Sequence, residues 1–179
     1  VEPVTAFTTL FETLQQLQAR KNLPPVHLWQ PETEGEIDIR IDADGTWFHE
    51  GGRFQRQSLA DLFATILRRE QDDYYLVTPA EKLRIQVEDV PFVAIDVDAR
   101  GEGESKDLLF TTSVGDYILA GEENQVWMRD GKPYVHIRHG LEARVQRAAY
   151  YRLIDEAVVR GEDMVVWSQG TCFSLGKIS

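Results

Sequence analysis

Apolar residues recur along this chain at two spacings, and each spacing predicts a different kind of element. In the first segment they are three or four positions apart, which places them on one side of a helix. This pattern predicts an N-terminal helix within residues 1–23, ended by Pro24 and Pro25. The residues of this apolar stripe are Phe7, Leu10, Phe11, Leu14 and Leu17.

Strict alternation of apolar and polar residues follows and predicts strands. Between residues 37 and 41, isoleucine alternates with charged residues, and Asp44–Gly45 is a turn that joins this strand to the next. Helical spacing then returns and predicts a helix over residues 58–70, with a buried side made of Leu59, Leu62, Phe63, Ile66 and Leu67. The strands predicted for the rest of this half span residues 74–77 and 83–87.

The second half of the chain carries the same kinds of pattern. Five strands are predicted, over residues 92–97, 108–112, 116–119, 125–128 and 134–138. Asp130–Gly131 is a second hairpin turn. A long helix is predicted over residues 141–160, ended by Gly161, with core positions at Val145, Ala149, Leu153, Ala157 and Val158. The closing strands span residues 164–167 and 172–175.

The order turn, strand, helix, strand begins at Asp44–Gly45 and again at Asp130–Gly131. We interpret it as an internal repeat, although this order is common and the residue identities barely match. The expected fold is α+β, with two small antiparallel β-rich lobes of repeated motif, one helix in each, and the N-terminal helix. The expected organisation is the N-terminal helix at 1–23, a first lobe at 24–90 with helix 58–70, and a second lobe at 91–179 with helix 141–160.

The composition limits the class of protein. The 179 residues are 42% hydrophobic and 27% charged, which is typical of a globular protein and excludes a disordered or fibrous chain. The net charge of −11 disfavours binding to nucleic acid or to an anionic membrane surface. Cys172 is the only cysteine, so no intramolecular disulfide can form, and we expect a cytoplasmic location.

No motif for a metal, a cofactor or covalent catalysis has the spacing that its chemistry needs. The acidic loop that begins at Asp96 has part of an EF-hand spacing but places Arg100 where an oxygen ligand is required. Residues 170–177 (GTCFSLGK) lack the spacing of a phosphate-binding loop. His136 and His139 would point to opposite faces of a strand. We therefore expect no cofactor and no metal.

Positive charge is concentrated between residues 128 and 152. Six basic residues oppose two acidic ones there, a net charge of +4, and the basic residues are Arg129, Lys132, Arg138, Arg144, Arg147 and Arg152. This concentration predicts a binding site for a carboxylate or phosphate, formed by Tyr134, His136, Arg138, Arg144 and Arg147. The first three would share one strand face, and the last two one helical stripe. Ion pairs with the acidic surface are the commoner use of such arginines.

A second polar cluster follows the tyrosine pair at residues 74 and 75. It consists of Thr78, Glu81, Lys82, Glu88 and Asp89. Glu88 and Asp89 are adjacent, so they cannot face each other as an acid–base pair on a continuing strand. The favoured interpretation is an ion pair of Lys82 with a carboxylate.

Five blocks of the sequence together resemble the bacterial domain-of-unknown-function family 1285. They are spread over most of the chain and read PVHLW at 25–29, DIRIDADGTW at 38–47, LVTPAE at 76–81, IQVEDVPF at 85–92 and GLEARVQR at 140–147. The resemblance implies a two-lobed α+β fold of repeated structural motifs. It also implies a role in signal transduction through a bound ligand, and it implies no catalytic residues.

The leading hypothesis is a non-enzymatic bacterial module for ligand binding or signal transduction that recognises a small anionic molecule. One alternative is a protein-interaction adaptor anchored by Trp29, Trp47 or Trp127, because Trp is favoured at binding hot spots. Another is an enzyme that uses His136 with a carboxylate for acid–base chemistry.

Overall fold

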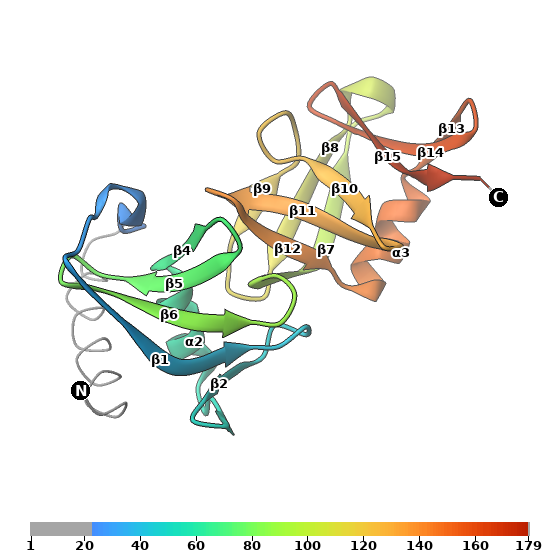
Figure 1. Ribbon diagram of the computed structural model, residues 1–179. Coiled ribbons are helices and arrows are strands. Elements are labelled where there is room, and N and C mark those ends of the chain that lie inside the picture. The colour runs from blue at the N-terminus through green and yellow to red at the C-terminus, as the bar shows by residue number, and fades with distance from the viewer. Residues whose placement is uncertain (1–22, 179) are drawn as a thin grey trace. The chain divides into compact units, whose positions relative to one another are not determined.

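The computed structural model describes residues 23–178, which divide into two compact units that meet in sequence between Asp89 and Val90 (Figure 1). The architecture is α+β and consists mostly of strands. Each unit contains one α-helix, α2 (Gln57–Ala64) in the first and α3 (Arg147–Asp155) in the second. The N-terminal helix predicted within residues 1–23 lies outside the described residues.

The first unit is built on one six-stranded sheet in the order β3-β2-β1-β6-β5-β4. All neighbours in it are antiparallel except the central pair, β1 and β6, which is parallel. A short 3-10 turn, η1 (Val26–Leu28), precedes the sheet. The strands are β1 (Thr33–Ile41), β2 (Trp47–His49), β3 (Gly52–Arg53), β4 (Leu67–Glu70), β5 (Asp73–Val77) and β6 (Glu81–Val87).

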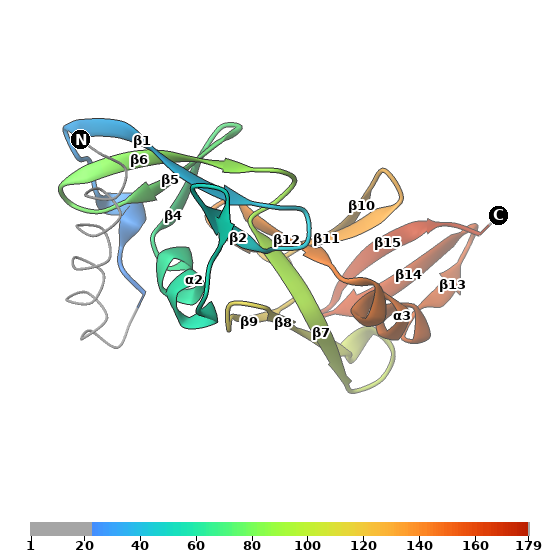
Figure 2. The same ribbon diagram turned by 90° about the horizontal axis from the view of Figure 1, so that it is seen from below.

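The core of the first unit follows from the alternation seen in the sequence. Ile37, Ile39 and Ile41 of β1 are buried, and the charged residues between them are exposed. Helix α2 lies against one face of the sheet (Figures 1 and 2) and buries Phe63 completely. Trp47 packs against Phe63 with their ring centroids 6.5 Å apart, so the helix and β2 share one aromatic core.

The second unit has a six-stranded sheet in the order β10-β11-β12-β7-β8-β9 and a separate three-stranded sheet, β13-β14-β15. The small sheet contacts the large one through β14 on β8 and β15 on β10, and α3 contacts β7. A 3-10 turn, η2 (Gly103–Ser105), precedes β8. The strands are β7 (Phe92–Arg100), β8 (Asp107–Thr112), β9 (Tyr117–Leu119), β10 (Val126–Arg129), β11 (Lys132–Arg138), β12 (Leu141–Val145), β13 (Val158–Arg160), β14 (Asp163–Ser168) and β15 (Thr171–Lys177).

The two large sheets share one topology. In each, two antiparallel groups of three strands meet at a parallel pair formed by the first and last strands of the sheet, β1 with β6 and β7 with β12. The sheets are therefore mixed, whereas the sequence predicted antiparallel lobes. The predicted internal repeat treated the turns Asp44–Gly45 and Asp130–Gly131 as equivalent, and this was wrong. Asp44–Gly45 follows the first strand of its sheet, whereas Asp130–Gly131 lies between the fourth and fifth strands of the other sheet.

Both predicted helices are shorter than the sequence pattern indicated. Residues 58–70 contain α2 from its second residue onward and the whole of β4, and residues 141–160 contain β12, α3 and β13. Leu141, Ala143 and Val145 alternate with polar residues, and this pattern of a strand was overlooked. His139 and Gly140 both have positive φ angles, of 46° and 79°, and form the tight turn from β11 into β12.

The hairpin predicted at Asp130–Gly131 is confirmed. Both residues have positive φ, 51° and 75°, and Arg129 pairs with Lys132 across this two-residue turn. The turn at Asp44–Gly45 is confirmed as well, with the Asp42 carboxylate accepting hydrogen bonds from the backbone N–H groups of Asp44 and Thr46. None of the helices in the described part of the chain is long and apolar enough to cross a membrane.

Candidate functional site

Strands β10, β11 and β12 bring a group of polar and aromatic side chains to one side of the second sheet. Trp127 pairs with Tyr134, and Tyr134 pairs in turn with Arg144, so these three side chains point the same way. Arg129 opposite Lys132 and His136 opposite Glu142 lie on the same side. We call this surface the cationic face, and it consists of Trp127, Arg129, Lys132, Tyr134, His136, Glu142 and Arg144.

The centre of the cationic face is the ring of Tyr134. The indole of Trp127 stacks on it with a centroid distance of 6.0 Å and an interplanar angle of 15°. The guanidinium of Arg129 lies 4.1 Å from the centroid of the same ring and 3.5 Å from a carboxylate oxygen of Glu142. Tyr134 is buried by these contacts and Arg129 is exposed. The face therefore presents a guanidinium that an aromatic ring holds in place.

The charge of the cationic face differs in sign from that of the chain. Arg129, Lys132 and Arg144 oppose one carboxylate, Glu142, which leaves a local net charge of +2 in a chain of net charge −11. A sheet face with two arginines and an aromatic surface suits a carboxylate or a phosphate, because the planar guanidinium donates two parallel hydrogen bonds. Two predicted site residues, Tyr134 and Arg144, lie at its centre.

His136 also lies on this face, but both of its ring nitrogens are engaged by the main chain. Nδ1 is 3.0 Å from the carbonyl oxygen of Glu123, and Nε2 is 3.0 Å from the backbone N–H of Gly140. A carbonyl only accepts and an amide N–H only donates, so Nδ1 carries the proton and Nε2 accepts. The ring fastens the turn after β11 to the loop before β10, which is a structural role and leaves no nitrogen for acid–base chemistry.

Arg138 does not join the cationic face. The register of β11 against β12 shifts between His136 and Arg138, so the simple alternation that predicted a shared face fails there. The guanidinium of Arg138 instead donates to the Asp116 carboxylate at 2.8 Å, and both side chains are about one-fifth exposed at 18% and 20%. It also lies 5.1 Å from the ring centroid of Phe92. Arg138 thus follows the ion-pair interpretation.

Arg147 is not part of the cationic face either. It is the exposed first residue of α3, whereas Arg144 belongs to β12, so the helical stripe predicted for the two residues does not exist. Arg152, in the same helix, is paired with Asp96 of β7. Arg147 and Arg152, which the sequence placed in the same positive region as Arg144, therefore lie on a different element.

Sequence reasoning missed the parts of the cationic face that β10 and the hairpin turn supply. Trp127 was considered only as a protein anchor, and Arg129 and Lys132 were counted as charges without a place in the site. The signal was present, because a two-residue turn at Asp130–Gly131 fixes the pairing of residues 129 with 132 and 127 with 134.

Lys82 of the second polar cluster is ion-paired, as the favoured interpretation predicted, but its partners Glu34 and Glu70 lie outside that cluster. Lys82 is only 9% exposed, and its ammonium lies 3.0 Å from a carboxylate oxygen of Glu70 and 3.0 Å from one of Glu34. These hydrogen bonds raise the pKa of Lys82 against the effect of burial. Arg68 donates to Glu70 at 2.6 Å and to the backbone carbonyl of Trp29 at 2.6 Å.

Burial and hydrogen bonding have opposite effects on the pKa of Glu70 in this network. Burial alone raises the pKa of the Glu70 carboxyl, but hydrogen bonds from Arg68 and Lys82 outweigh it and leave the pKa lowered. Burial raises the pKa of the Glu81 carboxyl. Glu88 has a different partner and pairs with Arg40 at 3.8 Å. The five predicted residues therefore do not form one site.

The tryptophans proposed as protein anchors have different surroundings. Trp47 is 2% exposed and belongs to the core with Phe63, so it was wrongly considered as a surface anchor. Trp127 is half-buried on Tyr134, and Trp29 is half-buried beside Arg68. The most exposed large apolar side chain on a strand is Tyr117 of β9, within the described residues.

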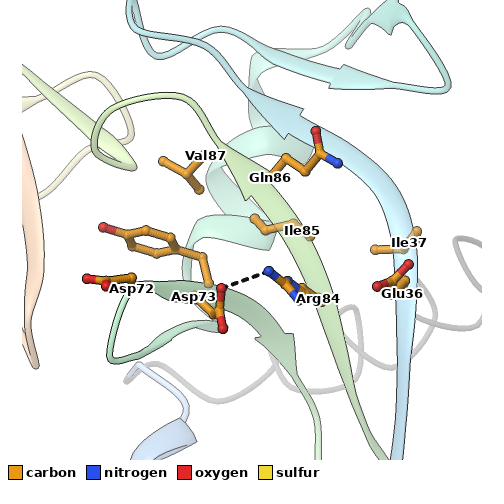
Figure 3. Close-up of a pocket in the computed structure, with 9 residues that line it drawn as sticks. Glu36, Ile37, Asp72, Asp73, Arg84, Ile85, Gln86 and Val87 are labelled. Atoms are coloured by element: carbon orange, nitrogen blue, oxygen red, sulfur yellow. Dashed lines mark hydrogen bonds and ion pairs between the residues drawn. The ribbon is translucent and has the colours of Figure 1, made fainter.

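The first unit contains a cavity of about 420 Å³ among strands β1, β5 and β6 (Figure 3). Its lining includes the buried residues Ile37, Tyr74 and Ile85 and charged residues that include Glu36 and Arg84. None of the residues predicted from the sequence to form a site lies in it. Among residues 23–178, no group of three or more His, Cys, Asp or Glu side chains is placed to hold a metal ion.

Comparison with known protein families identifies the family of this chain. Residues 24–90 match the domain of unknown function DUF1285, N-terminal domain, and residues 91–175 match the protein of unknown function DUF1285, C-terminal domain. The chain belongs to the DUF1285 family. No curated protein matches it significantly.

Two crystal structures of DUF1285 family proteins are similar to this chain. The protein from Silicibacter pomeroyi DSS-3 is 45% identical over 93% of this chain and 95% of its own, with a TM-score of 0.86. The protein from Shewanella baltica OS155 is 33% identical over 65% of this chain and 90% of its own, with a TM-score of 0.55. The family resemblance seen in the sequence is thereby confirmed, and the family description indicates no function.

Proposed function

We propose that this DUF1285 protein is a non-enzymatic binding module that recognises a small anionic molecule on the cationic face, as part of signal transduction. The observation that carries the proposal is the register of β10, β11 and β12, which places Arg129, Lys132 and Arg144 around Tyr134. A local charge of +2 in a chain of net charge −11 favours an anionic partner through simple Coulomb attraction.

The chemistry of the face narrows the ligand to an anion with a flat group. Arg129 and Arg144 supply guanidinium groups for a carboxylate or phosphate, and the half-buried indole of Trp127 offers a surface for a ring. His136 keeps the adjacent turn in place through its two main-chain hydrogen bonds. In this proposal Arg138 and Arg147 take no part in binding.

The proposal is tested by thermal stabilisation and calorimetry with three probes, namely inorganic phosphate, citrate and adenosine monophosphate. Sodium chloride at matched ionic strength is the control for screening. A specific ligand raises the unfolding temperature in a saturable way, because it binds the folded state alone. The effect is lost in the double variant Arg129→Gln with Arg144→Gln and is retained in Arg147→Ala, which removes an exposed arginine outside the face.

Two results would overturn the anionic site. One is that none of the three probes stabilises the protein beyond sodium chloride. The other is that Arg147→Ala weakens binding as strongly as the double variant, since that outcome requires general attraction to positive charge. The exposed Lys132 provides a further variant, Lys132→Gln, which reduces the charge of the face with little consequence for packing.

A protein-interaction role is the second candidate, and exposed strand edges favour it. Tyr117 and Leu119 are 70% and 41% exposed on β9, which is an edge strand of the second sheet. An edge strand with exposed apolar side chains is a surface to which another strand can add. A stoichiometric partner that is retained by the arginine variants and lost in Tyr117→Ser would favour this role over the first.

A further inference from the structure

The two large sheets carry one arrangement of side chains at equivalent positions. In each sheet a two-residue turn joins the edge strand to its neighbour, and this turn follows Glu70 of β4 in the first unit and Arg129 of β10 in the second. Counting from these turns, Tyr75 of β5 corresponds to Tyr134 of β11. The next, inner strand places an arginine opposite each tyrosine, so the correspondence extends across three strands.

An ion pair crosses the tyrosine diagonally in both sheets, but its charges are exchanged. It joins the edge strand to the position that Lys82 occupies in β6 and Glu142 occupies in β12. In the first unit the ammonium of Lys82 lies 3.0 Å from the Glu70 carboxylate and 4.6 Å from the centroid of the tyrosine ring. In the second unit the guanidinium of Arg129 lies 3.5 Å from the Glu142 carboxylate and 4.1 Å from the centroid of the tyrosine ring. The cation thus lies over the ring in both units, but it comes from opposite strands.

The two members of each pair differ in exposure in the same way. In the first unit the side chain of Lys82 on the inner strand is 11% exposed, and that of Glu70 on the edge strand is 36% exposed. In the second unit the corresponding values are 16% for Glu142 and 43% for Arg129. The inner strand therefore supplies a mostly buried anchor, and the edge strand presents the opposite charge to solvent. The presented charge is negative in the first unit and positive in the second.

We propose that the polarity of this pair makes the cationic face an anion site: Glu142, the buried member, positions Arg129, and Arg129, the exposed member, donates to the ligand. The inference rests on the proposed function and deepens it. Considered only as a charge, Glu142 would repel an anion. As an anchor it restricts the guanidinium to one place beside Tyr134, so less side-chain freedom is lost when a ligand binds.

Exchanging the two charges separates polarity from net charge. The double variant Arg129→Glu with Glu142→Lys leaves the net charge of the cationic face unchanged and reproduces the order of charges found in the first unit. It is therefore expected to fold with nearly the wild-type unfolding temperature. Calorimetry with inorganic phosphate and citrate is expected to show binding at least about tenfold weaker than that of wild type. Binding as tight as that of wild type would overturn the proposal, since net charge alone would then be sufficient.

The single substitution Glu142→Gln tests the positioning role, because the two possible roles of this acid predict opposite effects. Coulomb repulsion alone predicts tighter binding of phosphate and citrate once the negative charge is removed. The positioning role predicts an increase of about threefold or more in both dissociation constants, because Arg129 is held less firmly. Glu162→Gln, which removes an exposed acid of the second unit outside the face, is the matched control and is expected to leave both constants unchanged.

A measurement without ligand tests the positioning role independently of anion binding. The side chain of Arg129 lies against the ring of Tyr134, and the ring current displaces the nuclear magnetic resonance signals of its protons. In Glu142→Gln these signals are expected to move toward those of a solvated arginine, and in Glu162→Gln they are expected to stay in place. Signals that stay in place in Glu142→Gln would overturn the positioning role.

Binding to the wild type separates a failure of this inference from a failure of the proposed function. If neither phosphate nor citrate binds to the wild type, the proposed function fails and the inference fails with it. If both anions bind to the wild type and Glu142→Gln binds them equally or more tightly, the anion site remains and the inference alone is overturned.

Discussion

Replacing Glu70 by Gln tests whether the ion-pair network of the first unit stabilises the fold. The substitution keeps the shape of the side chain and removes the charge that Arg68 and Lys82 share. Arg68 donates to this carboxylate at 2.6 and 2.9 Å and Lys82 at 3.0 Å, and the amide of glutamine retains only one uncharged oxygen that can accept from them. Lys82 then remains almost buried with Glu34 as its one carboxylate.

The magnitude of this loss follows from the burial of the three partners. Removing one member of a buried ion pair costs about 3–5 kcal/mol, because the other charge remains desolvated. The Glu70 side chain is 36% exposed and Glu34 still faces Lys82, so solvent and the second carboxylate reduce the loss. We expect a decrease of about 2 kcal/mol in the free energy of unfolding.

The assay is urea denaturation at neutral pH, followed by circular dichroism and tryptophan fluorescence. The matched control is Glu32→Gln, which changes the same group at an exposed position. A cycle with Lys82→Met and the double variant separates the coupling of Glu70 with Lys82 from their individual effects. Equal stability of Glu70→Gln and Glu32→Gln, or a coupling near zero, would refute the reasoning.

The stability difference between wild type and Glu70→Gln is expected to depend on pH. The folded-state pKa of Glu70 is lowered, so its stabilisation is fully present above the ordinary glutamate pKa of about 4.3 and is lost as the pH falls through the folded value. The pKa of Lys82 is raised, so its contribution is present below the ordinary lysine value of about 10.4. The difference between wild type and Glu70→Gln should thus be constant near pH 7 and narrow in acid. A difference that does not narrow contradicts this assignment.

Two further predictions concern the second unit. Ser168 is fully buried, and its hydroxyl accepts from the N–H of Leu108 at 2.9 Å and donates to the carbonyl of Ala120 at 2.7 Å. Ser168→Ala should therefore lower the free energy of unfolding, measured by urea denaturation, by about 1–3 kcal/mol. Ser174→Ala, at an exposed position, should change it little. Gly131→Ala should lower the free energy of unfolding by about 1 kcal/mol, because the φ of Gly131 is 75° and nothing obstructs an added Cβ there. A loss no greater than that caused by Gly35→Ala in β1 would contradict the role of φ.

Local patterns in the sequence were sufficient for much of the fold. The isoleucines of β1 alternate with charged residues, and the structure buries them as that alternation predicted. The turn at Asp130–Gly131 was predictable because few pairs of residues tolerate two positive φ angles. The tight turn at His139–Gly140 was missed, and with it the strand β12, since the apolar residues from 141 to 145 fit both periods over so short a length.

The partners of charged residues were less predictable, because they depend on pairing over long distances in sequence. Arg138 meets Asp116 across 22 positions, and Lys82 meets Glu70 across 12. A register shift beside Arg138 also turns its side chain away from the face that alternation indicated. A count of charges located the positive region but could not show that Arg138 pairs with Asp116, which is distant in sequence, while Arg129 and Arg144 share one face of the second sheet.

The two large sheets show how one topology can produce two different surfaces. Each has a parallel pair at its centre, formed by its first and last strands. In the first unit this pair slips between Glu36 and Arg40, and the cavity lies beside the slip. In the second unit β12 pairs with β7 in continuous register from Ala143 to Val145. There the register shifts lie on either side of that pair, between β11 and β12 and between β7 and β8. Because backbone irregularities decide where side chains diverge from a regular sheet, the slip of β1 lies beside the cavity of the first unit, and the shift between β11 and β12 separates Arg138 from the cationic face.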